Sequence, residues 1–304
     1  MPESPSANAG LTGEEAAVRT LLAGHPATRL LAGGLLTLLD GGLSNRAWRA
    51  DHDGEAWFVR CGHPGAARLG VDRASECAVL EAVSAAGLAP GILACDPASG
   101  LLVTRFIEGP TWRAEDVLAE GNLGRVAERL RCLHGLPIPA GAQEVRYSAQ
   151  ARRLAAGLPA RSRDEAVLHE RATRAFTVLD GRGYSPALCH HDLHHLNLID
   201  AGDRLWLVDW EYGGRGDPLL DVAGFLALHE LGPEPTRIFL EAYGRLGPDE
   251  RALLGAARWA FDYVQWLWYR RRFEAAATGA HAREGSLARR LLHCDNALIA
   301  QGSG

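Results

Sequence analysis

The chain of 304 residues contains no lysine, so all 32 of its basic side chains are arginine. Any role that proteins usually give to a lysine ammonium must therefore fall to a guanidinium or be missing. The 37 acidic side chains outnumber the basic ones and give a formal net charge of −5. Because nucleic-acid binding needs a basic surface that displaces counterions from phosphates, this balance argues against a nucleic-acid partner.

Long apolar runs and targeting signals are missing as well. No run of about eighteen apolar residues occurs, so we expect no membrane-spanning helix and no membrane partner. The first residues, MPESPSANAG, carry neither the basic nor the apolar segment of a secretory signal. We therefore predict a disordered leader over residues 1–12 and a cytoplasmic protein. The oligomeric state is not indicated by any feature of the sequence.

The cysteines show no close spacing. Without a C-x-x-C pair, the sequence offers no zinc motif built on cysteine. In a cytoplasmic chain of this size, cysteines are expected to be reduced and to behave as small apolar residues. We predict this state for all six, which are Cys61, Cys77, Cys95, Cys132, Cys189 and Cys294.

The first third of the chain consists mostly of short apolar runs. Asp53-Gly54 separates two such runs and is a strong hairpin signal, and Pro97 to Gly100 marks the turn of a second hairpin. Between the two hairpins, VDRASECAVLEAVSAAG has the apolar period of a helix that ends at Gly87. This pattern predicts antiparallel strands with one main helix.

The remainder of the chain is dominated by helical patterns. NLGRVAERLRCLHGL is amphipathic, and beyond Asp217-Pro218 the pattern is helical to the end. Short strand-like runs, LCHHDL, NLID and RLWLVDW, lie between these helical segments. The predicted fold class is α+β, with an N-terminal lobe over residues 13–107, a hinge near 104–109 and a helical lobe over 110–304. Ligands bind in clefts of the kind that two lobes form.

Three polar side chains in the second half indicate chemistry. Asp192 precedes Asn197 by five residues, and Asp209 follows the apolar run LWLV. An amide oxygen and a carboxylate on neighbouring loops suit Mg²⁺, which takes a few hard oxygen ligands together with substrate phosphates. A separate carboxylate in the same cleft can orient an attacking hydroxyl. Asn197 and Asp209 are thus the candidate metal ligands, and Asp192 is the candidate base.

The spacing H-x-D-x-x-x-x-N, followed by an apolar strand and D-W-E, closely resembles the catalytic and metal loops of eukaryotic-like kinases. More narrowly, HHDLHHLN and VDWEYGGRGDPLLDVA resemble the family of choline/ethanolamine kinases, thiamine kinases and aminoglycoside phosphotransferases. GGLSNRAW, AWFVR, GVDRASE and LLVTRFIEG are similar to the segments that hold the nucleotide in that family. The colinear resemblance covers roughly residues 35 to 275 and implies a bilobal protein-kinase-like fold that uses ATP and Mg²⁺.

The resemblance also implies roles for individual residues. Asp192 would accept the proton of the substrate hydroxyl, and His190 would brace the catalytic loop. Arg60 would take the place of the strand lysine of protein kinases, since a guanidinium can hold a carboxylate and a phosphate at once. Glu76 would pair with Arg60 and hold it in place. The nucleotide would be bound by the glycine-rich loop, by this pair and by the hinge, which comprise Gly41, Gly42, Ser44 and Asn45, then Arg60 and Glu76, and then Phe106 and Ile107.

The implied acceptor is a small alcohol, and a cationic one is favoured. Trp259, Tyr263 and Trp266 form an aromatic stripe at helical spacing. Such a stripe usually belongs to a core, but it can also form a box around a quaternary ammonium group. Choline, ethanolamine, thiamine and aminoglycosides remain open as acceptors, although the arginine run YRRRF that follows the stripe disfavours aminoglycosides. The candidate substrate contacts are Glu211, His194, Trp259, Asp262, Tyr263 and Trp266.

Two other function classes have to be weighed. The four histidines of CHHDLHHLN suggest a metallohydrolase, but neighbouring strand residues point to opposite faces and cannot all converge on one ion. A non-catalytic nucleotide-binding scaffold is the other class, and the intact set of Asp192, Asn197 and Asp209 argues against it. The sequence therefore favours an ATP-dependent small-molecule kinase.

Overall fold

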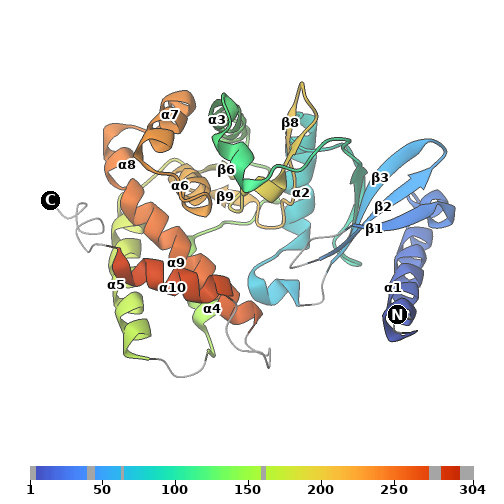
Figure 1. Cartoon of the computed structure of the whole chain (residues 1–304), viewed down its shortest axis with the longest axis horizontal. Helices are drawn as coiled ribbons and strands as arrows, with labels where there is room; N and C mark the ends of the chain where they lie inside the picture. Colours follow the sequence, from blue (N-terminus) through green and yellow to red (C-terminus); the bar gives the residue numbers. More distant parts are fainter. Residues whose placement is uncertain (1–4, 40–44, 63–64, 159–161, 274–281, 295–304) are drawn as a thin grey trace.

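The computed structural model describes residues 5–39, 45–62, 65–158, 162–273 and 282–294. A five-stranded antiparallel sheet lies at one end of the molecule and most helices lie at the other (Figure 1). This mixture confirms the predicted α+β class. The sheet has the strand order β1-β2-β3-β5-β4, with β1 (Leu35–Leu39), β2 (Arg46–His52), β3 (Glu55–Cys61), β4 (Ile92–Asp96) and β5 (Leu101–Arg105).

Both predicted hairpins are present, and their turns have the backbone that the residues favour. Asp53 (φ 50°) and Gly54 (φ 79°) turn β2 into β3 with two left-handed residues, as a type I′ turn requires. In the β4–β5 turn, the Asp96 side chain accepts the N–H of Ala98 at 3.0 Å, and Gly100 has φ 72°. Local turn chemistry thus sets the register of the antiparallel strands.

Helices cover both faces of the sheet. On one face, Val18 and Leu22 of α1 (Pro5–Gly24) pack in one cluster with the strand residue Trp48. On the other face, α2 (Arg73–Ala85) buries Val79 and Val83 in the main core, which continues into the helical half. The predicted main helix is therefore confirmed, and it joins the sheet to the rest of the molecule.

The prediction of a disordered leader over residues 1–12 is wrong from Pro5 onward, because α1 begins there. Residues 1–4 lie outside the described part of the chain. Proline is tolerated in the first turn of a helix, where its missing N–H would have no partner in any case. Tertiary packing of Val18 and Leu22 against the sheet stabilises α1, and the composition of the leader gave no sign of that packing.

The chain passes from the sheet to the helical half close to β7 (Leu198–Asp200). The Asp200 N–H donates to Pro110 O at 3.0 Å, and the Trp112 N–H donates to Leu198 O at 2.9 Å. A side chain at position 109 would overlap the carbonyl oxygen of Asp200, so Gly109 is required there. The connecting segment is thus bonded directly to the hairpin that follows the candidate catalytic loop.

The helical half surrounds α9 (Leu254–Arg272), which packs against α4, α5, α6 and α10 (Figure 1). Within the described residues beyond Asp217, every element is a helix, as predicted. The other helices are α3 (Asn122–Leu133), α4 (Tyr147–Ala155), α5 (Arg163–Gly181), α6 (Pro218–Leu228), α7 (Pro233–Tyr243), α8 (Pro248–Ala252) and α10 (Ala282–His293). Two small antiparallel pairs precede them, β6 (Ala187–Cys189) with β9 (Gly214–Gly216), and β7 with β8 (Leu205–Leu207).

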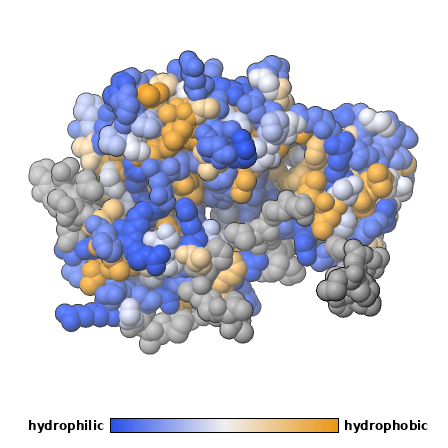
Figure 2. Space-filling view, viewed as in Figure 1, coloured by the Kyte–Doolittle hydropathy of each residue, from blue (hydrophilic) through white to orange (hydrophobic). Residues whose placement is uncertain are grey.

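Short 3₁₀ turns complete the described elements, namely η1 (Arg29–Gly33), η2 (Ala66–Leu69), η3 (Ala114–Leu118) and η4 (His195–Asn197). None of the helices in the described ranges combines the length and the apolar character that crossing a bilayer requires. On the face shown in Figure 2, hydrophilic residues predominate and hydrophobic ones form separate groups.

The prediction that all six cysteines are reduced is wrong for one pair. Cys77 on α2 and Cys95 on β4 form a disulfide across a Cα–Cα distance of 5.7 Å. The pairing follows from the packing of the helix on the strand, which cysteine spacing alone does not show. Of the described cysteines, the free ones are Cys61, Cys132, Cys189 and Cys294.

We predict that Asp72→Ala lowers the free energy of unfolding by about 1 kcal/mol, the usual effect of losing a helix N-cap. The Asp72 side chain accepts the N–H groups of Ala74 at 3.0 Å and Ser75 at 3.1 Å, and alanine cannot replace these bonds. Urea unfolding measures the change. Glu81→Ala, on the exposed side of the same helix, is the matched control, with an expected change below about 0.5 kcal/mol. Equal effects of the two substitutions would contradict the capping role.

Candidate active site

The candidate catalytic loop follows β6 and is held by a buried carboxylate from α6. Asp221 accepts the backbone N–H of His190 at 2.8 Å and that of His191 at 2.7 Å. His191 has φ 66°, a left-handed conformation that a non-glycine residue adopts only when its surroundings impose it. The Asp221 carboxylate therefore imposes the backbone turn that precedes Asp192.

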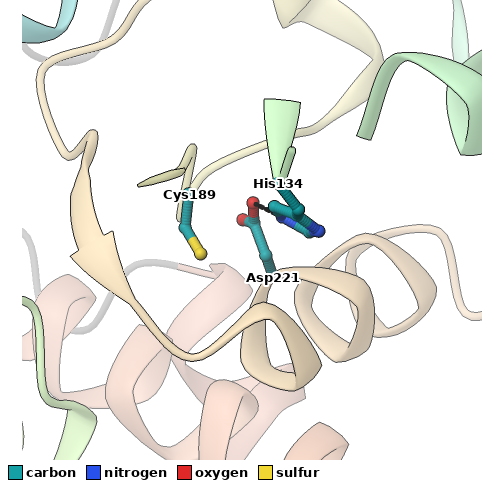
Figure 3. A group of neighbouring side chains, drawn as sticks. All are labelled: His134, Cys189 and Asp221. Atoms are coloured by element: carbon teal, nitrogen blue, oxygen red, sulfur yellow. Dashed lines mark hydrogen bonds and ion pairs between the residues drawn. The ribbon is translucent and has the colours of Figure 1, made fainter. Parts of the chain in front are cut away.

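A second layer of bonds fixes Asp221 (Figure 3). Its Oδ2 lies 3.0 Å from Nε2 of His134 on the end of α3, and Nδ1 of His134 lies 2.7 Å from the Tyr243 hydroxyl. Burial raises the pKa of the Asp221 carboxyl, but the hydrogen bond from His134 and the neighbouring imidazoles outweigh burial and lower it. Sequence reasoning missed Asp221 and His134. The available signal was a lone aspartate inside the apolar helix PLLDVAGFLAL.

His134, Cys189 and Asp221 lie close enough together to suggest a metal centre (Figure 3). However, both oxygens of Asp221 already accept hydrogen bonds, and both ring nitrogens of His134 already have partners. Burial raises the pKa of the Cys189 thiol well above its ordinary value, which disfavours the thiolate that a metal needs. The three residues are better explained as a hydrogen-bonded support for the catalytic loop.

His190 connects the loop of Asp192 with the loop of Asp209. Its Nδ1 accepts the Asp192 N–H at 3.3 Å, and its Nε2 donates to Val208 O at 3.0 Å, so the imidazole is neutral with its proton on Nε2. Burial also lowers the pKa of His190, which agrees with the neutral form. The ring packs on Trp210 with 4.5 Å between centroids. These contacts join the two loops through His190, and its role as a brace for catalysis stays a prediction.

Asn197 brings the same loops together from the other side. Its Nδ2 donates to Asp192 O at 2.8 Å, and its backbone oxygen accepts the Val208 N–H at 3.0 Å. Because the amide nitrogen faces the loop, the amide oxygen is the atom left to coordinate a cation. Asp209 follows β8 with φ 61°, a strained conformation of the kind that functional loops retain. The structure thus brings Asp192, Asn197 and Asp209 into one site.

Acidic side chains concentrate around this site. Burial raises the pKa of the Asp209 carboxyl, and the nearby Glu211 raises it further, while Arg60 opposes both effects. Nη1 of Arg60 lies 3.8 Å from Oδ1 of Asp209. A bound cation would stabilise the ionised form of Asp209, so this carboxylate could hold a metal.

The Arg60–Glu76 pair predicted from the sequence is present. Nη1 and Nη2 of Arg60 on β3 contact the two Glu76 oxygens of α2 at 2.5 and 2.7 Å. The side chains are only 5% and 1% exposed. Burial raises the pKa of the Glu76 carboxyl, but the charges of Arg60 and Arg73 outweigh it and lower the pKa. Glu76 is therefore ionised and holds Arg60 beside Asp209.

Arg73, which sequence reasoning missed, extends this pair across the site. Its Nη1 lies 2.7 Å from Oε2 of Glu76 and 3.3 Å from Oε2 of Glu211, and its Nη2 donates to Asn45 Oδ1 at 3.0 Å. Nδ2 of Asn45 donates to the same Glu211 oxygen at 2.9 Å. The buried Glu211, predicted as a substrate contact, is thus engaged with two residues from the sheet side of the molecule.

The other predicted nucleotide contacts have mixed outcomes. Gly41, Gly42 and Ser44 lie outside the described residues. The Phe106 N–H already donates to Ala56 O at 3.0 Å, so that N–H is not available to adenine. Ile107 is half-buried directly after it. The predicted nucleotide contact at Phe106 and Ile107 would therefore have to use Ile107 or the Phe106 carbonyl.

The aromatic stripe of α9 belongs to the core, so its interpretation as a substrate box is corrected. The Trp259 indole N–H donates to Leu291 O at 3.2 Å, and Tyr263 stacks on Trp259 with 5.5 Å between centroids. Trp266 packs near His169 of α5, which is also hydrogen-bonded to Tyr263. Asp262 pairs with Arg290 of α10. The four predicted residues, Trp259, Asp262, Tyr263 and Trp266, are all buried.

A different aromatic group lies closer to Asp192. The Trp268 indole N–H donates to the Tyr212 hydroxyl at 2.7 Å, and the Tyr269 ring meets Trp268 edge-on with 5.1 Å between centroids. These three side chains are half-buried. Burial raises the pKa of both tyrosines, and the charge of Asp192 adds to the shift in each. The run WLWY contains Trp268 and Tyr269, but the chosen helical period selected Trp259, Tyr263 and Trp266, which the structure buries in the core.

His194, the predicted substrate contact, lies beside the candidate base. Its Nε2 is 3.9 Å from Oδ2 of Asp192, and its Nδ1 accepts the Leu196 N–H at 3.2 Å. Burial lowers the pKa of His194 to about 4, so the ring is neutral near pH 7. A neutral imidazole in this position adds a polar group next to Asp192 without adding charge.

A sheet arginine held by a helix glutamate, facing an Asp-loop and a second aspartate after a short strand, defines a protein-kinase-like phosphotransferase. The profile of the phosphotransferase enzyme family matches residues 35–259. The chain belongs to this family and is a small-molecule kinase.

Solved structures share the fold over nearly the whole chain. A choline/ethanolamine kinase family protein from Mesorhizobium loti is 25% identical, with a TM-score of 0.79 over 95% of this chain and 98% of that one. Choline kinase LicA from Streptococcus pneumoniae is 19% identical, with a TM-score of 0.76 and the same coverage. The aminoglycoside phosphotransferase APH(4)-Ia is 17% identical, with a TM-score of 0.63 over 89% of this chain and 94% of its own. These likenesses confirm the predicted kinase-like fold.

Curated relatives match over shorter segments. The LicA protein of Haemophilus influenzae is 42% identical over 55 residues, which is 18% of this chain and 21% of that protein. A LicA homolog of Mycoplasma capricolum is 26% identical over 179 residues, covering 57% of this chain and 69% of the homolog. The match with the Haemophilus protein thus spans only about a fifth of the length of that protein.

We predict that Asp221→Asn lowers the free energy of unfolding by about 3 kcal/mol or more. An amide has a single acceptor oxygen, so it cannot replace all the bonds that the carboxylate forms with His134 and with the N–H groups of His190 and His191. Since folding lowers the pKa of Asp221, its contribution is present above the unfolded value of about 3.9 and declines as the pH falls below that value. Urea unfolding should therefore show a gap between the two proteins that is large at pH 7 and narrows in acid.

The control for this measurement is Asp203→Asn, which changes an exposed carboxylate in the turn between β7 and β8. Its stability is expected to stay within about 0.5 kcal/mol of the parent at every pH. An Asp221→Asn protein as stable as this control would show that the loop does not depend on the carboxylate.

Proposed function

We propose that this kinase transfers the γ-phosphoryl group of ATP, with Mg²⁺, to the hydroxyl of a small cationic alcohol of the choline or ethanolamine type. The observation that carries the proposal is the convergence of Asp192, Asn197 and Asp209 next to the Arg60–Glu76 pair. The nucleotide would bind between the sheet-containing residues 13–107 and the helical residues 110–304. The proposed use of ATP supports the predicted cytoplasmic location.

Asp192 is suited to the role of base. Burial raises the pKa of its carboxyl to about 6. A base is most effective when its pKa lies close to the working pH, because it is then largely ionised and still attracts a proton. Asp192 would orient the acceptor hydroxyl and take its proton as the phosphoryl group is transferred. His190, which is neutral, would keep the Asp192 backbone in place.

The donor atoms fit magnesium and triphosphate. The Asn197 amide oxygen and the Asp209 carboxylate are hard oxygen ligands, which Mg²⁺ prefers together with phosphate oxygens. When bound, the ion would neutralise the phosphate charge that develops during transfer. Arg60, kept in position by Glu76, would add a fixed positive charge next to Asp209. Because the transition state is loose, the positions of these charges account for most of the catalysis.

The aromatic group near Asp192 supports a cationic acceptor. Tyr212, Trp268 and Tyr269 provide ring faces, which attract quaternary or protonated ammonium groups. The carboxylate of Asp192 acts on the pKa of both tyrosines, so negative charge lies near the same rings. The structural likeness to a choline/ethanolamine kinase family protein agrees with this choice. Thiamine and aminoglycosides are the alternative acceptors.

We expect Asp192→Asn to lower kcat by about 10²- to 10⁴-fold, the usual contribution of a positioned base. ATP affinity should change little, since Asp192 lies on the acceptor side of the site. A coupled assay gives the rate and calorimetry gives the affinity. Asp203→Asn again serves as the charge-matched control and should keep full activity. Near-normal turnover by the Asp192→Asn protein would contradict the kinase assignment.

The acceptor is tested by measuring ATP turnover with choline, ethanolamine, thiamine and an aminoglycoside. Choline or ethanolamine should give the highest kcat/KM. Trp268→Ala should raise the KM for that acceptor about tenfold, as expected for a lost cation–π contact, and leave the KM for ATP unchanged. Trp206→Ala, a half-buried tryptophan on β8, is the control. Highest activity with an aminoglycoside would replace the proposed acceptor.

A further inference from the structure

Two neighbouring residues of α2 bind two different strands of the sheet. The Glu76 carboxylate is bonded to Arg60 on β3, and Cys77 is disulfide-bonded to Cys95 on β4. Consecutive residues of an α-helix project about 100° apart around its axis. Two attachments separated by that angle restrain both the distance of the helix from the sheet and its rotation about its own axis.

The strand register shows that both attachments use the same face of the sheet. Leu102 on β5 is directly opposite Arg60 on β3, and it is also directly opposite Cys95 on β4. Residues opposite each other in antiparallel strands point to the same face. The row Arg60, Leu102, Cys95 thus lies under α2, with the ion pair on one side of β5 and the disulfide on the other.

The Cys77–Cys95 disulfide lies at the edge of the sheet rather than inside the hydrophobic core. Strand β4 is the outer strand of the five-stranded sheet, and both Cys77 and Cys95 are half-buried. The bond closes a short span, with a sequence separation of 18. A chain of 304 residues buries a large core of its own, whereas chains that depend on disulfides for folding are usually small. The bond therefore has a local consequence, which is the attachment of α2.

We propose that Cys77 and Cys95 form a reversible redox site that controls the position of Glu76, and through it the Arg60 side chain. The oxidant would be a low-molecular-weight disulfide such as oxidised glutathione. One cysteine thiolate attacks a sulfur of that disulfide and releases a thiolate, and the second cysteine then displaces the other half. Two protein thiols and one small disulfide become one protein disulfide and two small thiols. The protein protons go to the two leaving thiolates.

The functional consequence rests on the proposed use of ATP. In the oxidised protein, α2 is attached at two points, and Glu76 keeps Arg60 beside Asp209. Reduction leaves α2 held against the sheet by the polar contacts of Glu76 and by the apolar packing of Val79 and Val83, so the part of the helix around Cys77 gains freedom to move. Nucleotide binding to the reduced protein must then restore the order that the disulfide otherwise supplies. By linkage, ATP should favour the oxidised form by the same factor.

The experiment compares the full chain equilibrated with oxidised or with reduced glutathione. Peptide mapping after alkylation identifies the thiols that react, which separates this pair from the half-buried Cys61. Hydrogen exchange of the α2 amides is measured without nucleotide, and ATP affinity is measured by calorimetry. We expect faster exchange in α2 and at least about fivefold weaker ATP binding after reduction, the lower range of measured couplings between sites.

Matched variants complete the design. Cys77→Ser combined with Cys95→Ser should resemble the reduced parent in both glutathione buffers. Cys132→Ser, which removes an exposed thiol on α3, should retain the redox response. Failure of the pair to oxidise, or α2 exchange that is identical in both states, would overturn the proposed site. If neither redox form binds ATP, the proposed kinase function fails, while α2 exchange still decides whether the redox site controls the helix.

Discussion

The active site depends on one buried carboxylate, that of Glu76, which receives two guanidinium groups. Arg60 comes from the sheet and Arg73 from the start of α2, and Arg73 continues to Glu211 in the helical half. A buried charge is tolerated only when partners replace its lost hydration, and removal of one partner leaves the others uncompensated. Charged contacts, and not apolar contact alone, therefore connect the sheet and α2 to the loop of Asp209 and Glu211.

Because the chain has no lysine, the positive charges of this network are all guanidinium groups. A guanidinium offers five N–H donors in a planar arrangement, so one side chain can contact several acceptors in fixed directions. Arg60 contacts both oxygens of Glu76 and approaches Asp209, and Arg73 contacts Glu76, Glu211 and Asn45. An ammonium group in either position would bind fewer partners with less directional control.

On the other side of the site, Asp221 plays a comparable part for the backbone. It binds two successive N–H groups and thereby holds His191 in its left-handed conformation. Two buried acidic side chains thus prepare the two sides of the site, one by fixing cationic side chains and the other by fixing a loop. Neither carboxylate has to contact the substrate for its loss to affect the chemistry.

Local signals allowed much of the fold to be predicted. The hairpin at Asp53-Gly54 and the helix ending near Gly87 follow from turn chemistry and apolar period, which depend on neighbouring residues only. The spacing of Asp192, Asn197 and Asp209 also predicted a common site, because short strands and loops connect the three residues.

Features that depend on tertiary contacts were not predictable in the same way. The packing of α1 on the sheet and the Cys77–Cys95 bond join segments whose meeting the local sequence does not report. The aromatic residues of α9 cover most of its circumference, so periodicity did not show which of them lie in the core and which are only half-buried. Asp221 lies within the segment VDWEYGGRGDPLLDVA, but its role depends on tertiary bonds to the His190 and His191 backbone, which the local sequence does not report.

The bond between Trp268 and Tyr212 has a consequence for the kinetics of the enzyme. Tyr212 lies three residues after Asp209, so the aromatic group and the candidate metal ligand share one short loop. Because the loop is already fixed by these contacts, a ligand that displaced Asp209 would also displace Tyr212 and its bond to Trp268. In the proposed reaction, a shared loop of this kind would make the binding of nucleotide and acceptor interdependent.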